Sequence, residues 1–164
     1  MGNRRLESFR AGEKNSLSYV WKSRNPLRVF FNFFIITISK YTPHFGFKNF
    51  LLRLTGIKIG KDASIGLAAM FDVFYPERIE IGENAIIGYN TTILAHEFLQ
   101  KELRVGDVKI GKNAMVGANS TVLAGVEIGE GATVSAMSLV DKDVPANCFA
   151  NGNPVVVVKK NGQR

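Results

Sequence analysis

The sequence predicts a parallel β-solenoid, a single repeated coil of short strands, and three observations within residues 59–140 lead to this fold class. Aliphatic residues recur every six positions, and the step holds over six consecutive units from Ile110 to Val140. The next residue is Gly in seven of the twelve units. The third residue after the aliphatic is usually Asn, Asp or Gly, which tolerate the left-handed backbone of a sharp corner. The repeating positions are Ile59, Ile65, Phe71, Ile81, Ile87, Ile93, Ile110, Val116, Val122, Ile128, Val134 and Val140.

Each six-residue unit is expected to form a short strand that ends at a corner and points one aliphatic side chain inward. A helix is excluded because six is not a multiple of 3.6 and because Gly recurs throughout the repeat. Hairpins are excluded because hairpin turn pairs and two-sided alternation are missing. Three sides close one triangular coil, so the repeats predict about four stacked coils with an aliphatic core.

Length and composition exclude several classes of protein. The chain has 164 residues, of which 46% are hydrophobic, a size and composition typical of one folded domain rather than a disordered chain. The lone Cys148 allows no internal disulfide, and a nucleophilic role for it is not expected because no second His lies nearby in the sequence. The two histidines, His44 and His96, form no zinc-finger cluster with it.

The N-terminal segment differs from the repeats in charge, and residues 1–54 are expected to form a basic, amphipathic helical segment. Residues 1–58 carry a net charge of +9, whereas residues 59–164 carry −2. The longest apolar run, Val29–Ile38, is half as long as the roughly 20 residues that span a bilayer, and it lacks a signal-peptide layout. Two interpretations stay open for this run: a buried helix, or a helix that contacts a membrane surface or a partner.

The repeat has one long interruption, and it places a histidine at a prominent position. The step from Ile93 to Ile110 is seventeen residues, so residues 97–107 are expected to leave the coil as a loop. His96 occupies the corner position just before this loop, where a side chain should point outward. Histidine has a pKa near neutrality and is suited to accept a proton from a hydroxyl group. His96 is therefore the candidate catalytic base.

Three stretches carry a family resemblance: IIGYNTTILAHE, VKIGKNAMVGANSTVLAGVEIG and SLVDKDVPANCFANGNP. They resemble the hexapeptide-repeat acyltransferases, in the branch similar to maltose, galactoside and other sugar O-acetyltransferases. The resemblance implies a left-handed parallel β-helix over residues 55–158, followed by a C-terminal tail at 159–164. It also implies a cytoplasmic homotrimer that moves an acetyl or similar acyl group from acetyl-CoA to a hydroxyl of a sugar or glycoconjugate. His96 would be the general base at a subunit interface, and no metal is required.

The same resemblance implies where the acyl donor binds. Backbone contacts and basic contacts to the CoA phosphates would come from Ala118, Ala136, Lys142 and Lys159. Two positions depart from the family pattern, because Met115 replaces a tryptophan and Val156 replaces a basic residue. Solvated surface charge is the alternative interpretation of both lysines.

The acceptor side follows the family less closely, because Gly66 stands where sugar-modifying relatives have an asparagine. Four extra residues after Phe71 break the repeat and are expected to present Asp72 and Tyr75 to the cleft. Asp72 would bind sugar hydroxyls and Tyr75 would stack on the ring, although both also suit a purely structural turn. Glu97 is a third candidate on the substrate side, where it would orient or polarise His96, and a surface role is its alternative.

Other functions are weighed against this one. A carbonic anhydrase of the same fold needs three metal-binding histidines, and the chain has two histidines in all. No recognition motif for nucleic acid accompanies the basic N-terminus. The remaining alternative is a non-catalytic trimeric scaffold that docks on membranes through that N-terminus, with peripheral membrane contact common to both functions. Failure to bind any acyl-CoA would favour the scaffold.

Overall fold

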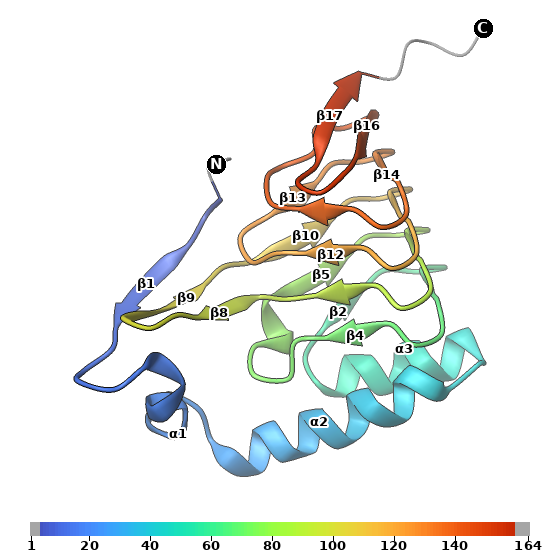
Figure 1. Cartoon of the computed structure of the whole chain (residues 1–164). Coiled ribbons are helices and arrows are strands. Elements are labelled where there is room, and N and C mark those ends of the chain that lie inside the picture. Colours follow the sequence, from blue (N-terminus) through green and yellow to red (C-terminus); the bar gives the residue numbers. More distant parts are fainter. Residues whose placement is uncertain (1–3, 160–164) are drawn as a thin grey trace, which may run out of the picture.

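The computed structural model describes residues 4–159, and its main body is a stack of coils that pass through three parallel sheets in turn (Figure 1). The sheet orders are β13-β10-β5-β2, β17-β16-β14-β11-β6-β3 and β15-β12-β7-β4, with only β17 antiparallel. Consecutive strands thus lie in different sheets, and each coil stacks on the previous one. The strands are β2 (Lys58–Ile59), β3 (Ser64–Ile65), β4 (Met70–Phe71), β5 (Ile79–Ile81), β6 (Ile86–Ile87), β7 (Thr92–Ile93), β10 (Val108–Ile110), β11 (Met115–Val116), β12 (Thr121–Val122), β13 (Glu127–Ile128), β14 (Thr133–Val134), β15 (Leu139–Val140), β16 (Cys148–Asn151) and β17 (Val156–Lys159).

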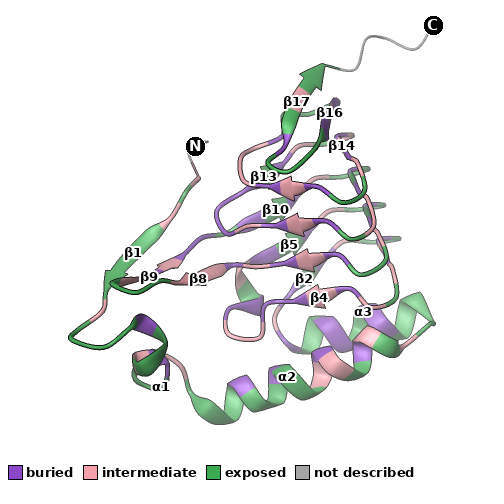
Figure 2. Ribbon diagram, in the orientation of Figure 1, coloured by how far each residue is buried: buried purple, intermediate pink, exposed green. Residues whose placement is uncertain are grey.

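The aliphatic repeat forms the core, as the period predicts. Residues of equal phase pair in register from coil to coil, for example Ile59 with Ile81 and Ile81 with Ile110. All twelve repeat positions are buried: eleven of them are at most 1% exposed, and Ile59 is 9% exposed. Figure 2 shows buried residues recurring along every coil of the prism.

The corners also follow the pattern. Asp62, Asn84, Asn90, Asn113 and Asn119 have positive φ, as do Gly125 and Gly131. The glycine that follows each aliphatic is explained by close contact between coils. A Cβ at Gly82 would lie 2.6 Å from the carbonyl carbon of Gly111, so a side chain is excluded there.

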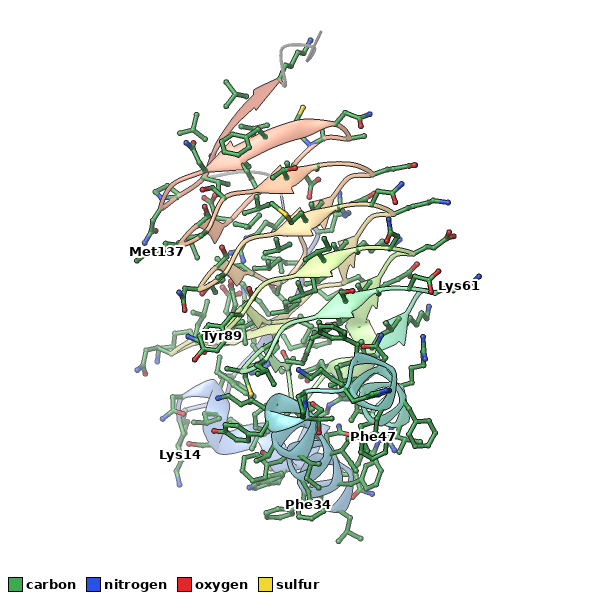
Figure 3. The ribbon with its side chains drawn as sticks, turned by 90° about the vertical axis from the view of Figure 1, so that its right-hand side faces the viewer. Lys14, Phe34, Phe47, Lys61, Tyr89 and Met137 are labelled. Atoms are coloured by element: carbon green, nitrogen blue, oxygen red, sulfur yellow. The ribbon has the colours of Figure 1, made fainter. Side chains whose placement is uncertain are left out.

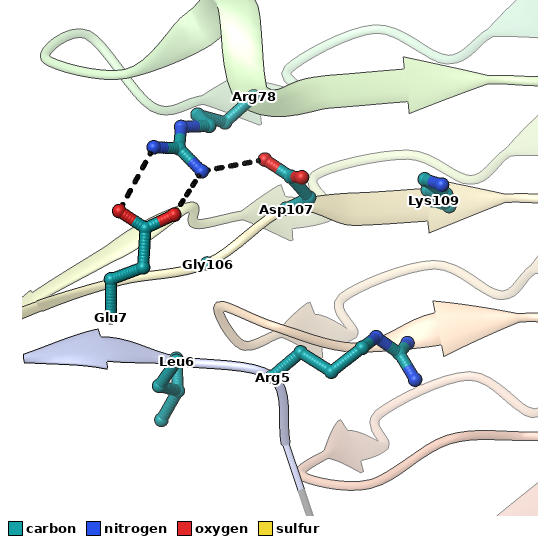
Figure 4. Close-up of a pocket in the computed structure, with 7 residues that line it drawn as sticks. All are labelled: Arg5, Leu6, Glu7, Arg78, Gly106, Asp107 and Lys109. Carbon is teal, nitrogen blue, oxygen red and sulfur yellow. Dashed lines mark hydrogen bonds and ion pairs between the residues drawn. The ribbon is translucent and has the colours of Figure 1, made fainter.

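The interruption at residues 97–107 is an antiparallel hairpin rather than an irregular loop. It consists of β8 (His96–Phe98) and β9 (Glu102–Val105), and the N-terminal strand β1 (Glu7–Arg10) pairs with β9 as a third strand. The expected helical segment therefore begins with a strand. Figure 4 shows Arg78 between Glu7 of β1 and Asp107, with nitrogen–oxygen distances of 2.9 and 3.1 Å. These bonds raise the pKa of the Arg78 guanidinium and tie β1 to the prism.

Helices close the lower end of the prism. They are the 3-10 helix η1 (Ser16–Tyr19), α1 (Val20–Ser23), α2 (Pro26–Tyr41) and α3 (Phe45–Leu54). A separate 3-10 turn, η2 (Pro76–Arg78), precedes β5 within the coils. None of the helices among residues 4–159 is long and apolar enough to cross a membrane. The expected C-terminal tail at 159–164 lies outside the described residues except for Lys159, as do residues 1–3 of the N-terminal segment.

Several basic residues of the N-terminal segment have structural partners that the charge pattern did not reveal. Lys48 is 2% exposed, and its ammonium group donates to the carbonyls of Ile65 (3.2 Å) and Gly66 (2.9 Å). Asn49 donates to Ala63 at 2.8 Å, and Arg53 donates to Ile59 at 2.9 Å. These carbonyls belong to the first coil and have no coil beneath them, so α3 saturates the open edge of the prism.

Candidate active site

His96 is the first residue of β8, where the chain leaves the coil after β7 for the hairpin. The corner position predicted an outward-pointing side chain; His96 is not among the buried core residues, but only 12% of its side chain is exposed because other residues cover it. Three aromatic rings surround the imidazole, namely Phe98 at 4.6 Å, Phe74 at 5.2 Å and Tyr75 at 5.6 Å between ring centroids. The enclosure reflects the extra residues after Phe71, which fold back over the histidine.

Asp72 holds the imidazole from beneath. Its side chain is fully buried, and its Oδ2 is hydrogen-bonded to Nδ1 of His96. The backbone amides of Phe74 (2.8 Å), Tyr75 (2.9 Å) and Ala95 (2.8 Å) also donate to this carboxylate. Burial alone would raise the pKa of Asp72, but the bond to His96, its charge and the amide bonds outweigh burial and lower the pKa.

This pairing determines which nitrogen of His96 can act as a base. An ionised carboxylate only accepts hydrogen bonds, so Nδ1 carries the proton and the lone pair lies on Nε2. The same geometry fixes the orientation of the ring. The arrangement can therefore remove a proton from a group that approaches Nε2.

The structure differs from the expectation that Asp72 and Tyr75 face a cleft. Asp72 has no exposed side-chain surface, so it cannot contact an acceptor directly. Tyr75 is 9% exposed, and the Arg24 guanidinium covers its ring at 3.7 Å from the centroid. Arg24 also donates to the carbonyl of Phe74 at 2.6 Å and forms an ion pair with Glu77. The turn is thus packed from both sides and positions His96.

Glu97 has a partner that the sequence did not suggest. Its carboxylate forms an ion pair with Arg4, and both side chains are largely buried. Arg4 also donates to the carbonyl of Ala124 at 3.3 Å. Glu97 therefore ties the N-terminal residues to the hairpin next to His96, and its side chain does not contact the imidazole in the described structure.

The four residues expected to bind the acyl donor lie at different places on the prism. Ala118 and Ala136 follow β11 and β14 on consecutive coils, where Met137 N donates to Ala118 O at 2.8 Å. Lys142 follows β15, two coils beyond the corner of His96, and its ammonium lies 3.9 Å from Asp141. Lys159 is exposed at the end of β17. The two alanines lie at the corner that precedes the sheet of β4, β7, β12 and β15, whereas His96 lies at the corner that follows this sheet. The structure therefore does not bring all these residues together within one chain.

An aromatic series leads from His96 to the lower helices. Trp21 lies 6.5 Å from Phe74 and stacks on Phe30 of α2 at 6.4 Å with an interplanar angle of 13°. Composition gives no sign of this series, because Phe74 is far from Trp21 and Phe30 in sequence. The hollow shown in Figure 4 lies elsewhere, and none of the predicted site residues lines it.

Within residues 4–159, no three or more His, Cys, Asp or Glu side chains gather in a way that could hold a metal ion. Cys148, on β16, is a buried free thiol.

Comparisons with known proteins bear on the family and the fold of the chain. The family described as bacterial transferase hexapeptide (six repeats) matches residues 107–142. "Putative acetyltransferase YvoF" of Bacillus subtilis is 48% identical over 145 residues, which cover 88% of this chain and 84% of that protein. "Putative colanic acid biosynthesis acetyltransferase WcaF" of Escherichia coli is 29% identical over 150 residues, covering 76% and 81%. The crystal structure of a hexapeptide-repeat acetyltransferase from Vibrio cholerae, complexed with acetyl-CoA, has a TM-score of 0.65 at 16% identity, covering 84% and 88%.

The chain belongs to the hexapeptide-repeat acetyltransferase family, and it is an enzyme of that class. The identity to the Bacillus subtilis protein and its coverage of both chains establish the family. The likeness to the Vibrio cholerae structure establishes the fold.

Proposed function

We propose that this acetyltransferase moves an acetyl group from acetyl-CoA to a hydroxyl of a sugar or glycoconjugate, with His96 as the general base. The observation that carries the proposal is the buried Asp72 carboxylate on Nδ1 of His96, which orients the ring and leaves Nε2 free to accept a proton. Acetyl-CoA supplies an activated thioester, so the reaction needs neither a metal nor a covalent enzyme intermediate.

In the proposed reaction, His96 Nε2 takes the proton of the acceptor hydroxyl while that oxygen attacks the thioester carbonyl. The new C–O bond replaces the C–S bond, and the imidazolium then returns the proton to the departing thiolate. A positioned base of this kind contributes about 10²–10⁴-fold to the rate. Asp72 stabilises the imidazolium that forms between the two proton transfers.

The active site is proposed to lie between neighbouring chains of a trimer of left-handed β-helices. Ala118 and Ala136 lie across one prism face from His96, so a neighbour that places its own alanine corner near this histidine would complete the site. Lys142 and Lys159 are proposed to contact the CoA phosphates. Acetyl-CoA is a cytoplasmic metabolite, so the reaction is assigned to the cytoplasm.

The acceptor class is supported by the relative named for colanic acid biosynthesis. A non-catalytic scaffold would have no use for a buried carboxylate that orients a histidine, so catalysis is favoured over the scaffold. The aromatic rings around His96 suit the apolar face of a sugar. Tyr75 acts on the acceptor through the shape of this enclosure, and Glu97 acts indirectly, through its ion pair with Arg4 beside the hairpin.

The test is thiol release from acetyl-CoA across a panel of sugars and polyols. The wild type is expected to release thiol in the presence of an acceptor, and His96→Ala to lower kcat by about 10²-fold or more. His44→Ala is the matched control, because His44 caps α3 by accepting from Phe47 N at 3.1 Å and lies outside the site. Equal release from wild type and His96→Ala would remove His96 as the base. Absence of acetyl-CoA binding by the wild type would favour the scaffold.

A further inference from the structure

The two lower helices have the reverse of the usual polarity. The inward stripe of α2 consists of Val29, Asn32, Ile36 and Ser39, two of which are polar. Its outward side carries Leu27, which is 80% exposed, Phe30 at 65% and Phe34 at 64%. A helix on the surface of a globular protein normally buries its apolar stripe.

Helix α3 shows the same mixture. Its buried residues are Lys48, Asn49, Leu51 and Leu52, and the two polar ones bind carbonyls of the first coil. Phe45, Phe47 and Phe50 are each more than half exposed. Figure 3 shows Phe34 and Phe47 at the lower end of the molecule, directed away from the coils. These side chains form one face, which we call the basal face: Trp21, Leu27, Phe30, Phe31, Phe33, Phe34, Ile38, Tyr41, Phe45, Phe47, Phe50 and Leu54. An apolar face of this extent indicates an interaction site.

Positive charge predominates around the basal face, where Glu77 forms an ion pair with Arg24. Residues 14–54 contain seven Lys or Arg and no Asp or Glu. Lys14 and Lys22 are exposed, and Lys22 and Lys40 lie beside the rings of Tyr19 and Tyr41 at 5.2 and 5.8 Å. Within the described part of the chain, none of these three ammonium groups forms an ion pair with a carboxylate. Two copies of this face pressed together would oppose like charges, whereas an anionic surface is complementary.

We propose that the basal face docks on the surface of an anionic phospholipid bilayer. Phe and Trp side chains enter the boundary between headgroups and acyl chains, and the surrounding lysines bind lipid phosphates, as in interfacial amphipathic helices. Neither helix spans the bilayer. Docking at this face would also bring His96 close to the membrane surface, because Trp21 and Phe74 connect the face to the imidazole. The proposal does not depend on the reaction proposed above.

The test is co-sedimentation of the full chain with vesicles of phosphatidylcholine alone or mixed with phosphatidylglycerol. The wild type is expected to bind the mixed vesicles, to bind pure phosphatidylcholine less, and to lose binding as salt is raised. The double variant F30S/F34S should bind about ten-fold more weakly or worse. Its matched control is V156S/V158S, which removes two exposed apolar side chains at the opposite end of the prism and should bind as the wild type does.

A second pair of variants tests the charge. K14Q/K22Q should weaken binding to the mixed vesicles, whereas K61Q/K109Q, on the prism, should not. The proposal is overturned if the wild type stays in the supernatant, or if F30S/F34S binds as well as V156S/V158S. It is also overturned if F30S/F34S lowers the mass measured by light scattering, since the face would then join copies of the chain. Far-UV circular dichroism shows whether each variant is folded. Since no acetyl-CoA is present, failure of docking leaves the proposed acetyl transfer untouched, and the converse holds.

Discussion

The coils and the helical base differ in which residues point inward. In the coils, aliphatic side chains such as Ile87 and Val116 point inward, and backbone groups bond to the next coil. At the base there is no next coil, and the residues that point inward include Lys48 and Asn49. Val29, Ile36 and Leu52 of the base are buried, but most of its aromatic side chains are exposed. Burial of a residue here is thus determined by which backbone groups need a partner, and not by hydropathy alone.

The largest expected contrast between the two regions is in the free energy of unfolding. Ile87→Ala removes a side chain that is 1% exposed and should destabilise the protein by about 2–5 kcal/mol. Phe34→Ala removes a larger side chain that is 64% exposed and should change stability by less than about 0.5 kcal/mol. Urea unfolding without lipid measures both. Similar losses for the two variants would mean that the basal face is packed in solution.

The candidate active site lies where the coils meet the helical base. A substitution of Asp72 measures how far catalysis depends on the bond between Asp72 and His96. Asp72→Asn should keep the turn but weaken the orientation of His96, lowering kcat by about 10²-fold with little change in KM. Combined with His96→Ala, it should cause little further loss, because the two residues act as a unit. Asp62→Asn is the matched control at an exposed corner where other coils have Asn. Additive losses in the double variant would contradict a positioning role.

The Asp72→Asn variant should also differ from the wild type in how its stability depends on pH. The pKa of Asp72 lies below its ordinary value of 3.8, so its ionised form favours the folded state. That contribution is complete above about pH 4 and is lost as pH falls through the lower folded-state pKa. Acid unfolding of Asp72→Asn should therefore lack this part of the pH dependence.

The smallest of the expected effects concerns the open edge. Asn49→Leu adds apolar surface to α3 but leaves the carbonyl of Ala63 without its donor at 2.8 Å, so stability should fall by about 1 kcal/mol. Phe50→Leu, on the exposed side of the same helix, should be neutral. Urea midpoints distinguish the two, and a stabilised Asn49→Leu would show that edge saturation does not determine the inward residues.

The six-residue period alone predicted the coils. Each unit repeats the same local requirement, for example a residue without a side chain at Gly82 and at Gly111, where the next coil passes close by. It also located His96, since an interruption of a strict repeat is visible in sequence. The sequence did not predict the strand at Glu7–Arg10 or the bond between Asp72 and His96. Both depend on contacts between residues far apart in the chain, and no local pattern records them. Phe71 pairs with Ile93, which places Asp72 below the corner of His96. An alignment of the repeats with one another would therefore have predicted that Asp72 and His96 are neighbours.

The pairing of Arg5 has a consequence for how the protein folds. Arg5 N donates to Gly125 O at 3.2 Å, and its guanidinium binds Asp143 at 2.9 Å, across 138 residues. Contacts of such sequence separation form late, because the intervening chain must be ordered first. Residues 4–10 are synthesised early, yet their partners exist only once the later coils have closed. The contacts of Arg5 therefore require the coils that carry Gly125 and Asp143 to be closed, whereas β1 also pairs with β9 of the hairpin that begins at His96.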